Sequence, residues 1–160
     1  MMTIKIIGAS GSGKSSLINA LQESDSRFVG VNFSSYIEKF GKNTEKELAS
    51  FLASLKNEIV FMDEHLEIGQ DDFRPLYRQE NTIGLIYLDL SVNEILNRRH
   101  KDKNRVRYGD RSVISKDIFS IESRLSLILR SLNLPSLFLQ EMSLDFSVQL
   151  ARSFAYGAVS

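Results

Sequence analysis

Hydrophobic residues occur in short runs of strand length, and amphipathic segments separate these runs. Five runs have the length and the β-branched or aromatic content of buried strands, at residues 3–7, 27–33, 58–63, 82–88 and 137–139. Apolar residues recur at helical spacing over residues 16–21, 34–40, 43–55, 91–96, 115–132 and 144–154. Because strands that alternate with helices are joined by crossovers, the pattern predicts an α/β fold with an open parallel sheet covered by helices on both faces.

Polar residues at the ends of these segments predict where the helices begin and end. Ser34-Ser35 is a suitable N-cap for the second helix, and Gly41 is expected to end it. Asn43-Thr44 followed by Glu47 resembles a capping box for the third helix. Ser91 is expected to cap the helix that follows the fourth strand.

The stretch between the first strand and the first helix is Gly8–Ser16, which reads GASGSGKSS and fits G-x-x-x-x-G-K-[ST]. A glycine-rich turn that contains Lys-Ser by chance is the alternative, but a strand precedes the loop and a helix follows it, as a phosphate-binding P-loop requires. We therefore predict a three-layer P-loop NTPase fold, with a five-stranded parallel sheet in the order 2-3-1-4-5.

The residue types of this loop suit a nucleotide. Glycines allow positive φ and close approach, so that successive N–H groups can point into one concavity, and the helix that follows adds its positive dipole end. Lys14 is expected on the β- and γ-phosphates, and the Ser15 hydroxyl is expected to ligate Mg²⁺. The predicted nucleotide-binding residues of the loop are Gly8, Ser10, Gly11, Ser12, Gly13, Lys14, Ser15 and Ser16.

Composition excludes several other classes of protein. The 160 residues suffice for one compact domain, so residues 1–160 are expected to form a single unit. The formal net charge is +0, which gives no reason to expect a nucleic-acid partner. The chain has no cysteine, no apolar stretch near the roughly 20 residues of a membrane helix and no visible signal peptide. We therefore expect a cytoplasmic protein without a membrane partner.

The third predicted strand ends in a carboxylate, Asp63. P-loop proteins place the acid that holds Mg²⁺ at such a strand end, so Asp63 is the predicted second metal ligand. The alternatives are a strand that ends in an acid by chance, or an aspartate that caps a helix. His65, two residues further on, is either a polar loop residue or a contact to the substrate.

Arginines are concentrated between residues 98 and 111, at positions 98, 99, 105, 107 and 111. An isolated run of this kind indicates a solvated charged surface. Next to a phosphate site it indicates a lid, since arginine forks suit the charge that develops in phosphoryl transfer. We expect the lid at about residues 98–114, with Tyr108-Gly109-Asp110 as its turn. Arg124 is either a surface residue or a further phosphate contact.

At these residues the chain resembles the short, archaeal-type adenylate kinases and related ATPases of the nucleoside monophosphate kinase group. GASGSGKSS is similar to their P-loop, VNFSSYIEK to the segment that enters their monophosphate site, and IVFMDEH to their strand ending in Asp-x-His. DLSVNEILNRRHKDKNRVR resembles their helix and lid, and IESR the segment with their later arginine. The resemblance implies that Arg98 or Arg99, Arg105, Arg107 and Arg124 contact ATP or acceptor phosphates, with Arg105 also flanking the adenine.

The acceptor side departs from this family. The region at about residues 32–57 is shorter and lacks the Arg-Asp-x-x-Arg stretch that grips the acceptor monophosphate. The loop after Asp-x-His reads EIGQDDFRPLYRQ, with Arg74 and Arg78 in a different pattern. Asn32, His65, Arg74 and Arg78 are the candidate contacts to the acceptor.

Two functions are compatible with these features. The leading hypothesis is a Mg-ATP-dependent phosphotransferase that uses Lys14, Arg105, Arg107 and Arg124 in catalysis and acts on a small molecule, in particular a nucleoside monophosphate. The reduced acceptor region also fits an ATP-operated switch or assembly factor with a protein or ribonucleoprotein partner. A GTPase is disfavoured, because the chain contains no Asn-Lys-x-Asp stretch.

Overall fold

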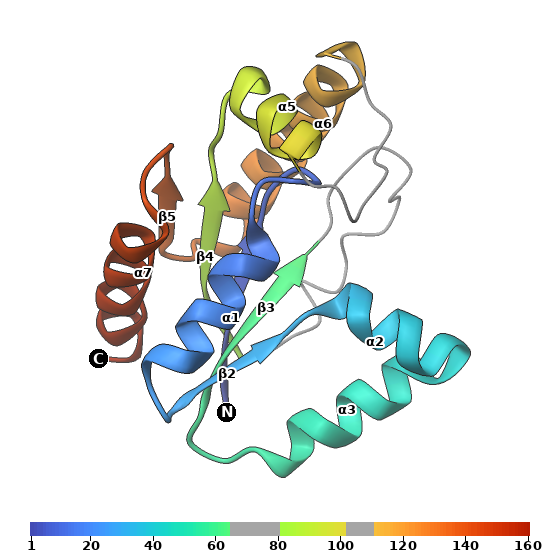
Figure 1. The fold of residues 1–160 in the computed structure, drawn as a ribbon. Coiled ribbons are helices and arrows are strands. Elements are labelled where there is room, and N and C mark those ends of the chain that lie inside the picture. Colours follow the sequence, from blue (N-terminus) through green and yellow to red (C-terminus); the bar gives the residue numbers. More distant parts are fainter. Residues whose placement is uncertain (65–80, 102–110) are drawn as a thin grey trace.

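The computed structural model describes residues 1–64, 81–101 and 111–160 (Figure 1). Its sheet has five parallel strands in the order β2-β3-β1-β4-β5, so the predicted sheet and strand order are confirmed. The strands are β1 (Met2–Ile7), β2 (Phe28–Val31), β3 (Ile59–Glu64), β4 (Thr82–Leu88) and β5 (Ser136–Leu139). The described helices are α1 (Lys14–Ser24), α2 (Phe33–Phe40), α3 (Thr44–Ser54), α5 (Val92–Lys101), α6 (Arg111–Leu132) and α7 (Leu144–Val159), with a 3₁₀ turn η1 (Gly41–Asn43) before α3.

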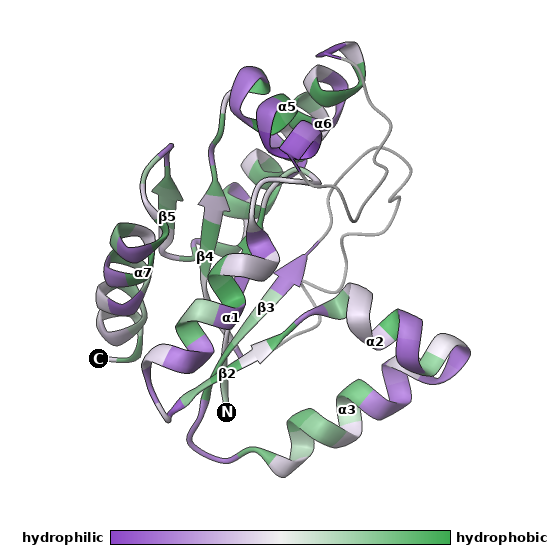
Figure 2. Ribbon diagram, viewed as in Figure 1, coloured by the Kyte–Doolittle hydropathy of each residue, from purple (hydrophilic) through white to green (hydrophobic). Residues whose placement is uncertain are grey.

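The helices cover both faces of the sheet, which gives three layers (Figure 1). On one face, Ile4 and Ile6 of β1 pack with Leu17 and Ile18 of α1, and α7 joins them through small side chains. The opposite face is covered in two parts, by α5 and α6 over β4 and by α3 over β2 and β3. Because both faces are buried, the strands are almost continuously apolar, as Figure 2 shows along β4.

The polar carboxyl-terminal end of β3 marks the end of the sheet at which we expect the site. Figure 2 shows β3 changing from hydrophobic to hydrophilic at its tip, where its sequence passes from Ile-Val-Phe-Met to Asp63 and Glu64. Asp63 lies beside Ile6 and Glu64 beside Ile7, so β1 and β3 end together. Ligands of open parallel sheets bind outside the carboxyl ends of the strands, so this edge is the expected site.

Two helix starts differ from the sequence predictions. Helix α2 begins at Phe33, one residue before the predicted Ser34-Ser35 cap, and its N-cap Asn32 makes no side-chain cap hydrogen bond. Asp63 accepts from the N–H of Phe33 instead, so an acceptor from another element replaces a local cap. The predicted capping box of α3 is also absent, since Asn43 makes no side-chain cap hydrogen bond and the Thr44 hydroxyl donates to the Gly41 carbonyl.

The predicted end of α2 and the predicted cap of α5 are confirmed. Gly41 follows the last residue of α2, and its N–H donates to the carbonyl of Ile37. The Ser91 hydroxyl accepts from the N–H of Glu94 in the first turn of α5. Helix α6 begins at Arg111, earlier than the predicted 115, so the outer residues of the predicted lid, 98–101 and 111–114, are helical.

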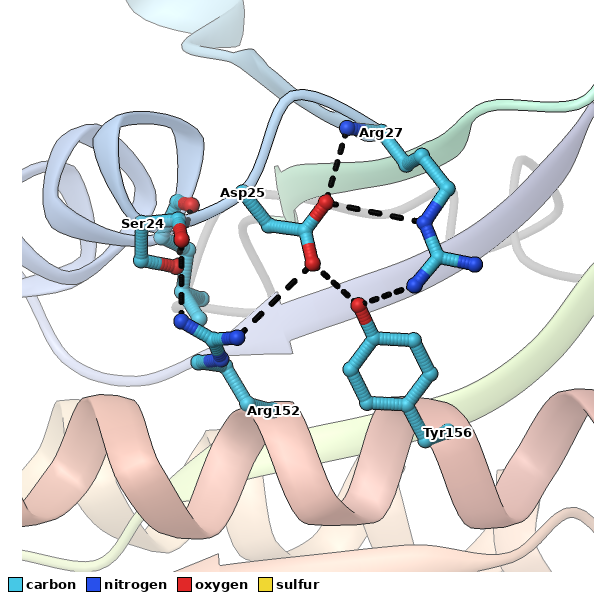
Figure 3. A network of polar contacts seen from close by, with 6 residues as sticks. Ser24, Asp25, Arg27, Arg152 and Tyr156 are labelled. Carbon is cyan, nitrogen blue, oxygen red and sulfur yellow. Dashed lines mark hydrogen bonds and ion pairs between the residues drawn. The ribbon is translucent and has the colours of Figure 1, made fainter.

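Helix α7 is tied to the turn between α1 and β2 by a polar network (Figure 3). The Tyr156 hydroxyl donates to Asp25 and accepts from Arg27 Nη2, and the Arg27 guanidinium lies 4.9 Å from the centre of the Tyr156 ring. Arg152 donates to the carbonyl of Ser24 at 2.9 Å. The hydrogen bond from Tyr156, followed by that from the Arg27 N–H, holds the pKa of Asp25 below its ordinary value.

Within the described ranges, none of the helices combines the length and the apolar character needed to cross a membrane.

Candidate functional site

The loop between β1 and α1 has the backbone that the P-loop pattern predicts. Gly11 has φ of 88° and Gly13 has φ of 97°, and both values lie in the left-handed region that favours glycine. Gly8 does not have a positive φ, so of the two predicted roles of these glycines it has only the close approach. Close packing explains Gly8 instead, because a Cβ there would lie 2.5 Å from Ser12 Oγ and 3.1 Å from Leu88 Cβ.

The start of α1 is open toward an anion. Gly13 is its N-cap, no side chain caps its first turn, and that turn contains no acidic residue. The first N–H groups of a helix have no partner within the helix and carry its positive dipole end. A phosphate at this position would satisfy them, as it does in other glycine-loop sites.

Lys14 lies inside the loop. Its Nζ donates to the carbonyl oxygens of Gly8 at 2.5 Å and of Ala9 at 3.2 Å. Lys14 as a whole is only 7% exposed. A phosphate oxygen is a stronger acceptor for this ammonium than a neutral carbonyl, because both partners of that hydrogen bond are then charged. The Lys14 side chain thus lies along the loop backbone, and its contact with the β- and γ-phosphates stays a prediction.

Two arginines of α5 pack against the same loop. Arg98 Nη1 donates to the carbonyl of Ser12 at 2.8 Å, and Arg99 Nε donates to the carbonyl of Ser10 at 2.9 Å. Their surroundings differ, since the Arg98 side chain is 35% exposed and that of Arg99 is only 4% exposed. Both are thus close to the predicted phosphate site, one at its surface and one beneath it.

The Arg98 side chain is also linked to the connection between β5 and α7. Its Nε donates to Glu94 Oε1 at 2.9 Å, and this hydrogen bond lowers the pKa of Glu94. Glu94 shares a second hydrogen bond with Glu141, and this contact raises the pKa of Glu141. Arg98 therefore faces a carboxyl pair on one side and the phosphate-binding loop on the other.

A cavity of about 260 Å³ lies beside the loop. It is bounded by Ser12, Gly13, Arg98, Leu88, Leu139 and Met142. Ser12 is 2% exposed, and its hydroxyl is one of three buried side-chain polar atoms without a hydrogen-bond partner in the described structure. An apolar cavity with a few polar groups next to a phosphate loop has the character of a small-molecule site.

Asp63 and Ser15 are the residues that could hold Mg²⁺. Asp63 is 3% exposed, and its Oδ1 accepts from the Phe33 N–H at 2.6 Å. No group of three His, Cys, Asp or Glu side chains suited to a metal occurs in residues 1–64, 81–101 and 111–160. A hydroxyl and one carboxylate fit a Mg²⁺ that takes its other ligands from water and nucleotide phosphates, the usual arrangement for this ion.

Comparison with known proteins identifies the family. A family model described as "ATPase family associated with various cellular activities (AAA)" matches residues 4–84, from the first strand and its loop to the start of β4. The chain belongs to the AAA ATPase family. The match covers half of the chain and includes both the loop with Lys14 and strand β3 with Asp63.

The fold of this AAA ATPase-family chain is similar to that of two solved structures. It is similar to a gluconokinase from Sinorhizobium meliloti 1021, with 17% identity, a TM-score of 0.61, and coverage of 97% of this chain and 91% of that one. It is also similar to a shikimate kinase from Acinetobacter baumannii in complex with shikimate, with 17% identity, a TM-score of 0.65 and coverage of 98% and 94%. No curated protein matches the chain. At this identity the structures show a shared P-loop kinase fold.

The predicted acceptor residues and the predicted catalytic arginines are only partly within the described structure. Asn32 follows β2 as the N-cap of α2. Its Nδ2 donates to Asn19 Oδ1 at 3.2 Å, and its own Oδ1 is buried without a described partner. Arg124 lies on α6 and is partly buried. His65, Arg74, Arg78, Arg105 and Arg107 lie outside the described residues.

A buried ion pair at the same sheet edge is absent from the sequence predictions. Lys5, in the middle of β1, is 1% exposed, and its Nζ lies 2.9 Å from Glu64 Oε2 and 3.2 Å from Met62 Sδ. The signal was a lysine inside the hydrophobic run Thr-Ile-Lys-Ile-Ile, since buried lysines are rare unless they are paired. Because side chains alternate along a strand, Glu64 and Asp63 point to opposite faces of the sheet.

Proposed function

We propose that the protein is a Mg-ATP-dependent phosphotransferase of the nucleoside monophosphate kinase type. It transfers the γ-phosphoryl group of ATP to a small acceptor, a nucleoside monophosphate. The observation that carries the proposal is the packing of Arg98 and Arg99 against a loop that already contains a buried Lys14. Three cations around one phosphate-binding loop suit the stabilisation of transferred charge. The kinase folds of the two similar structures support the same class of reaction.

In this proposal the bound nucleotide extends from the phosphate-binding loop to the cavity beside it. The triphosphate lies on the N–H groups of the loop and of α1, and Lys14 turns from the carbonyls of Gly8 and Ala9 to the phosphates. The base enters the 260 Å³ cavity, where Leu88 and Leu139 offer apolar contact and Arg98 offers a guanidinium plane. The unpartnered Ser12 hydroxyl gains an acceptor from the nucleotide.

Mg²⁺ would be held by Ser15 and Asp63, and it would neutralise charge on the β- and γ-phosphates. The Asp63 carboxylate keeps one oxygen on the N–H of Phe33, which fixes the direction of the other. Residues 1–160 then form one kinase-like domain, with an acceptor region at about 32–57 and a lid at about 98–114. Arg105, Arg107 and Arg124 contact the phosphates from the lid side, in keeping with the resemblance to adenylate kinases.

A monophosphate acceptor fits this site better than water does. Its phosphate is already ionised, so transfer needs positioning rather than a general base. The acid next to Asp63 is Glu64, and its carboxylate is 2.9 Å from the buried ammonium of Lys5. Because side chains alternate along a strand, Glu64 points to the face of the sheet opposite to that of Asp63, so it is not placed beside the proposed Mg²⁺ to activate water.

The second candidate is an ATP-operated switch or assembly factor that acts with a protein or ribonucleoprotein partner. The family to which the chain belongs favours it, because that family is defined as one of ATPases. The two candidates make different products, since the switch hydrolyses ATP slowly without an acceptor.

A coupled assay of ADP formation separates the two candidates. The acceptor panel consists of nucleoside monophosphates, gluconate and shikimate, the last two chosen from the names of the similar structures. Rapid ADP formation only with a monophosphate supports the proposed kinase. Rapid turnover only with gluconate or shikimate keeps the kinase and corrects the acceptor, whereas slow hydrolysis that no acceptor accelerates supports the switch.

A further inference from the structure

Arg99 is the more deeply buried of the two arginines on the loop. Its guanidinium Nε donates to the carbonyl of Ser10 at 2.9 Å, and its Nη2 lies 3.7 Å from Asp117 Oδ2 on α6. Its aliphatic part packs on Gly11, where a Cβ would lie 2.9 Å from Arg99 Cγ. Arg98 borders the cavity beside the loop, whereas Arg99 is not among the residues that line it. The site therefore has one arginine that a ligand can reach and one that it cannot.

The hydrogen bond from Arg99 fixes the direction of a backbone N–H. A trans peptide is planar, so the carbonyl of Ser10 and the N–H of Gly11 point in opposite directions. Gly11 has φ of 88° and no side chain. Because glycine can adopt many backbone conformations, its residue type alone does not hold the loop in this one. A donor that holds the Ser10 carbonyl on one side of the loop thereby keeps the Gly11 N–H on the other side.

Asp117 connects this hydrogen bond to a second helix. Helix α5 ends at Lys101 and α6 begins at Arg111, so Arg99 and Asp117 lie on the two helices that flank residues 102–110. The Asp117 side chain is 19% exposed, and its ion pair with Arg99 restricts where the guanidinium can lie. The backbone of the loop and the spacing of the two helices are thus linked through a single side chain.

We propose that Arg99 is a positioning residue that holds the Gly11 N–H toward the nucleotide phosphates by binding the carbonyl of Ser10, and that Asp117 keeps Arg99 in this place. The inference rests on the proposed function, because the group that the N–H meets is a phosphate of the bound nucleotide. It assigns the paired arginines different roles, with Arg98 in contact with the nucleotide and Arg99 in contact with the loop.

The test measures binding of three ligands to purified full-length variants by calorimetry, with Mg²⁺ present for ATP and ADP. The variants are Arg99→Met, Arg99→Lys, Asp117→Asn and the double variant Arg99→Met/Asp117→Asn. Arg130→Met, which removes an exposed arginine of α6, is the matched control. ATP and ADP report on the loop, and adenosine reports on the cavity alone. Thermal midpoints show whether each variant folds.

Arg99→Met is expected to weaken ATP and ADP binding by about tenfold, the scale of losing one charge-assisted hydrogen bond, and to leave adenosine binding within about twofold. Arg99→Lys keeps the charge and should recover part of the loss. Asp117→Asn should weaken ATP binding by about threefold in the parent chain and have no further effect in Arg99→Met, because the two residues act as a unit. Arg130→Met should bind all three ligands as the parent does.

The outcomes separate the inference from the proposed function. A parent protein that binds neither ATP nor ADP contradicts the nucleotide site itself. A parent that binds both, together with a folded Arg99→Met variant that binds them equally well, overturns the role of Arg99 alone. Equal losses for ATP, ADP and adenosine also overturn it, because a general weakening of the fold would produce them. If Arg99→Met does not fold, unchanged ATP binding by both Arg99→Lys and Asp117→Asn overturns it.

Discussion

Asp63 Oδ1, at the end of β3, accepts a hydrogen bond from the backbone N–H of Phe33, at the first residue of α2. The two residues are 30 positions apart, and the carboxylate is buried. Asp63 therefore joins the sheet to the helix that begins the proposed acceptor region. If it also ligates Mg²⁺, one side chain couples the nucleotide to that helix.

Substitutions at Asp63 can separate the structural role from the metal role. Asp63→Asn keeps an oxygen that can accept from Phe33 but removes the charge, so its stability should stay near that of the parent while phosphoryl transfer falls by about 10²-fold or more. Asp63→Ala leaves the Phe33 N–H without its partner and should lose about 1–3 kcal/mol of unfolding free energy as well. Urea denaturation and Mg²⁺ titration of ADP formation provide the two measurements. Equal activity of the Asn variant and the parent would refute the metal role.

Lys14 offers the most direct test of the loop. Lys14→Ala removes the ammonium that lies on the carbonyls of Gly8 and Ala9, and with it the cation proposed for the β- and γ-phosphates. Transfer should be abolished and most ATP binding lost, as measured by calorimetry and by the coupled assay. Lys116→Ala, which removes an exposed lysine of α6, is the matched control and should behave as the parent does. Unchanged turnover in Lys14→Ala would remove the loop from the reaction.

The loop and the sheet could be predicted from the sequence because local residue types determine them. Glycine is needed where φ is positive, as at Gly11 and Gly13, and an apolar run with turn residues on both sides indicates a buried strand. The start of α2 could not be predicted in this way. Its acceptor Asp63 comes from a strand that follows the helix in sequence, so nothing local distinguishes Phe33 from Ser34 as the first helical residue.

The roles of the paired arginines also depend on tertiary packing. Successive residues of an α-helix point about 100° apart, so Arg98 and Arg99 had to face different surroundings. The sequence does not say which of them faces the loop from below, because the carbonyl bound by Arg99 lies 89 positions away. The ion pair of Lys5 with Glu64 spans 59 positions and was missed for the same reason.

The Lys5–Glu64 pair should make a strongly non-additive contribution to stability. Lys5→Met leaves the Glu64 carboxylate without its buried partner and should cost about 3–5 kcal/mol of unfolding free energy. The double variant Lys5→Met/Glu64→Gln removes both charges and should be more stable than Lys5→Met. A double-mutant cycle measured by urea denaturation checks this. If the losses of unfolding free energy in the single variants Lys5→Met and Glu64→Gln add up to the loss in the double variant, the pair makes no coupled contribution.

Arg105 and Arg107 are proposed to meet the transferred phosphoryl group, on the strength of their resemblance to the lid of adenylate kinases. Removal of either charge in Arg105→Ala or Arg107→Ala should lower kcat by about 10³-fold or more, the scale of an arginine that stabilises charge only in the transition state. ATP binding should fall far less, and calorimetry measures it independently. A loss of kcat below about threefold would assign these arginines to a solvated charged surface instead.

The network around Tyr156 predicts a stability effect that depends on pH (Figure 3). The ordinary pKa of an aspartate in the unfolded chain is near 3.8, and the hydrogen bonds from Tyr156 and from the Arg27 N–H hold the pKa of Asp25 in the folded protein below that value. A group of this kind contributes stability that is fully present above the unfolded pKa and is lost as the pH falls through the folded pKa.

Tyr156→Phe removes the largest of these contacts, so it should lower Tm at pH 7, and the difference from the parent should shrink as the pH falls below 3.8. Calorimetric melting curves between neutral and acidic pH provide the measurement. Tyr36→Phe also removes one hydroxyl but lies on α2, away from Asp25, so its difference from the parent should not change over the same pH range. A Tyr156→Phe difference that persists unchanged in acid would mean that the hydroxyl stabilises α7 through Arg27 and not through the charge of Asp25.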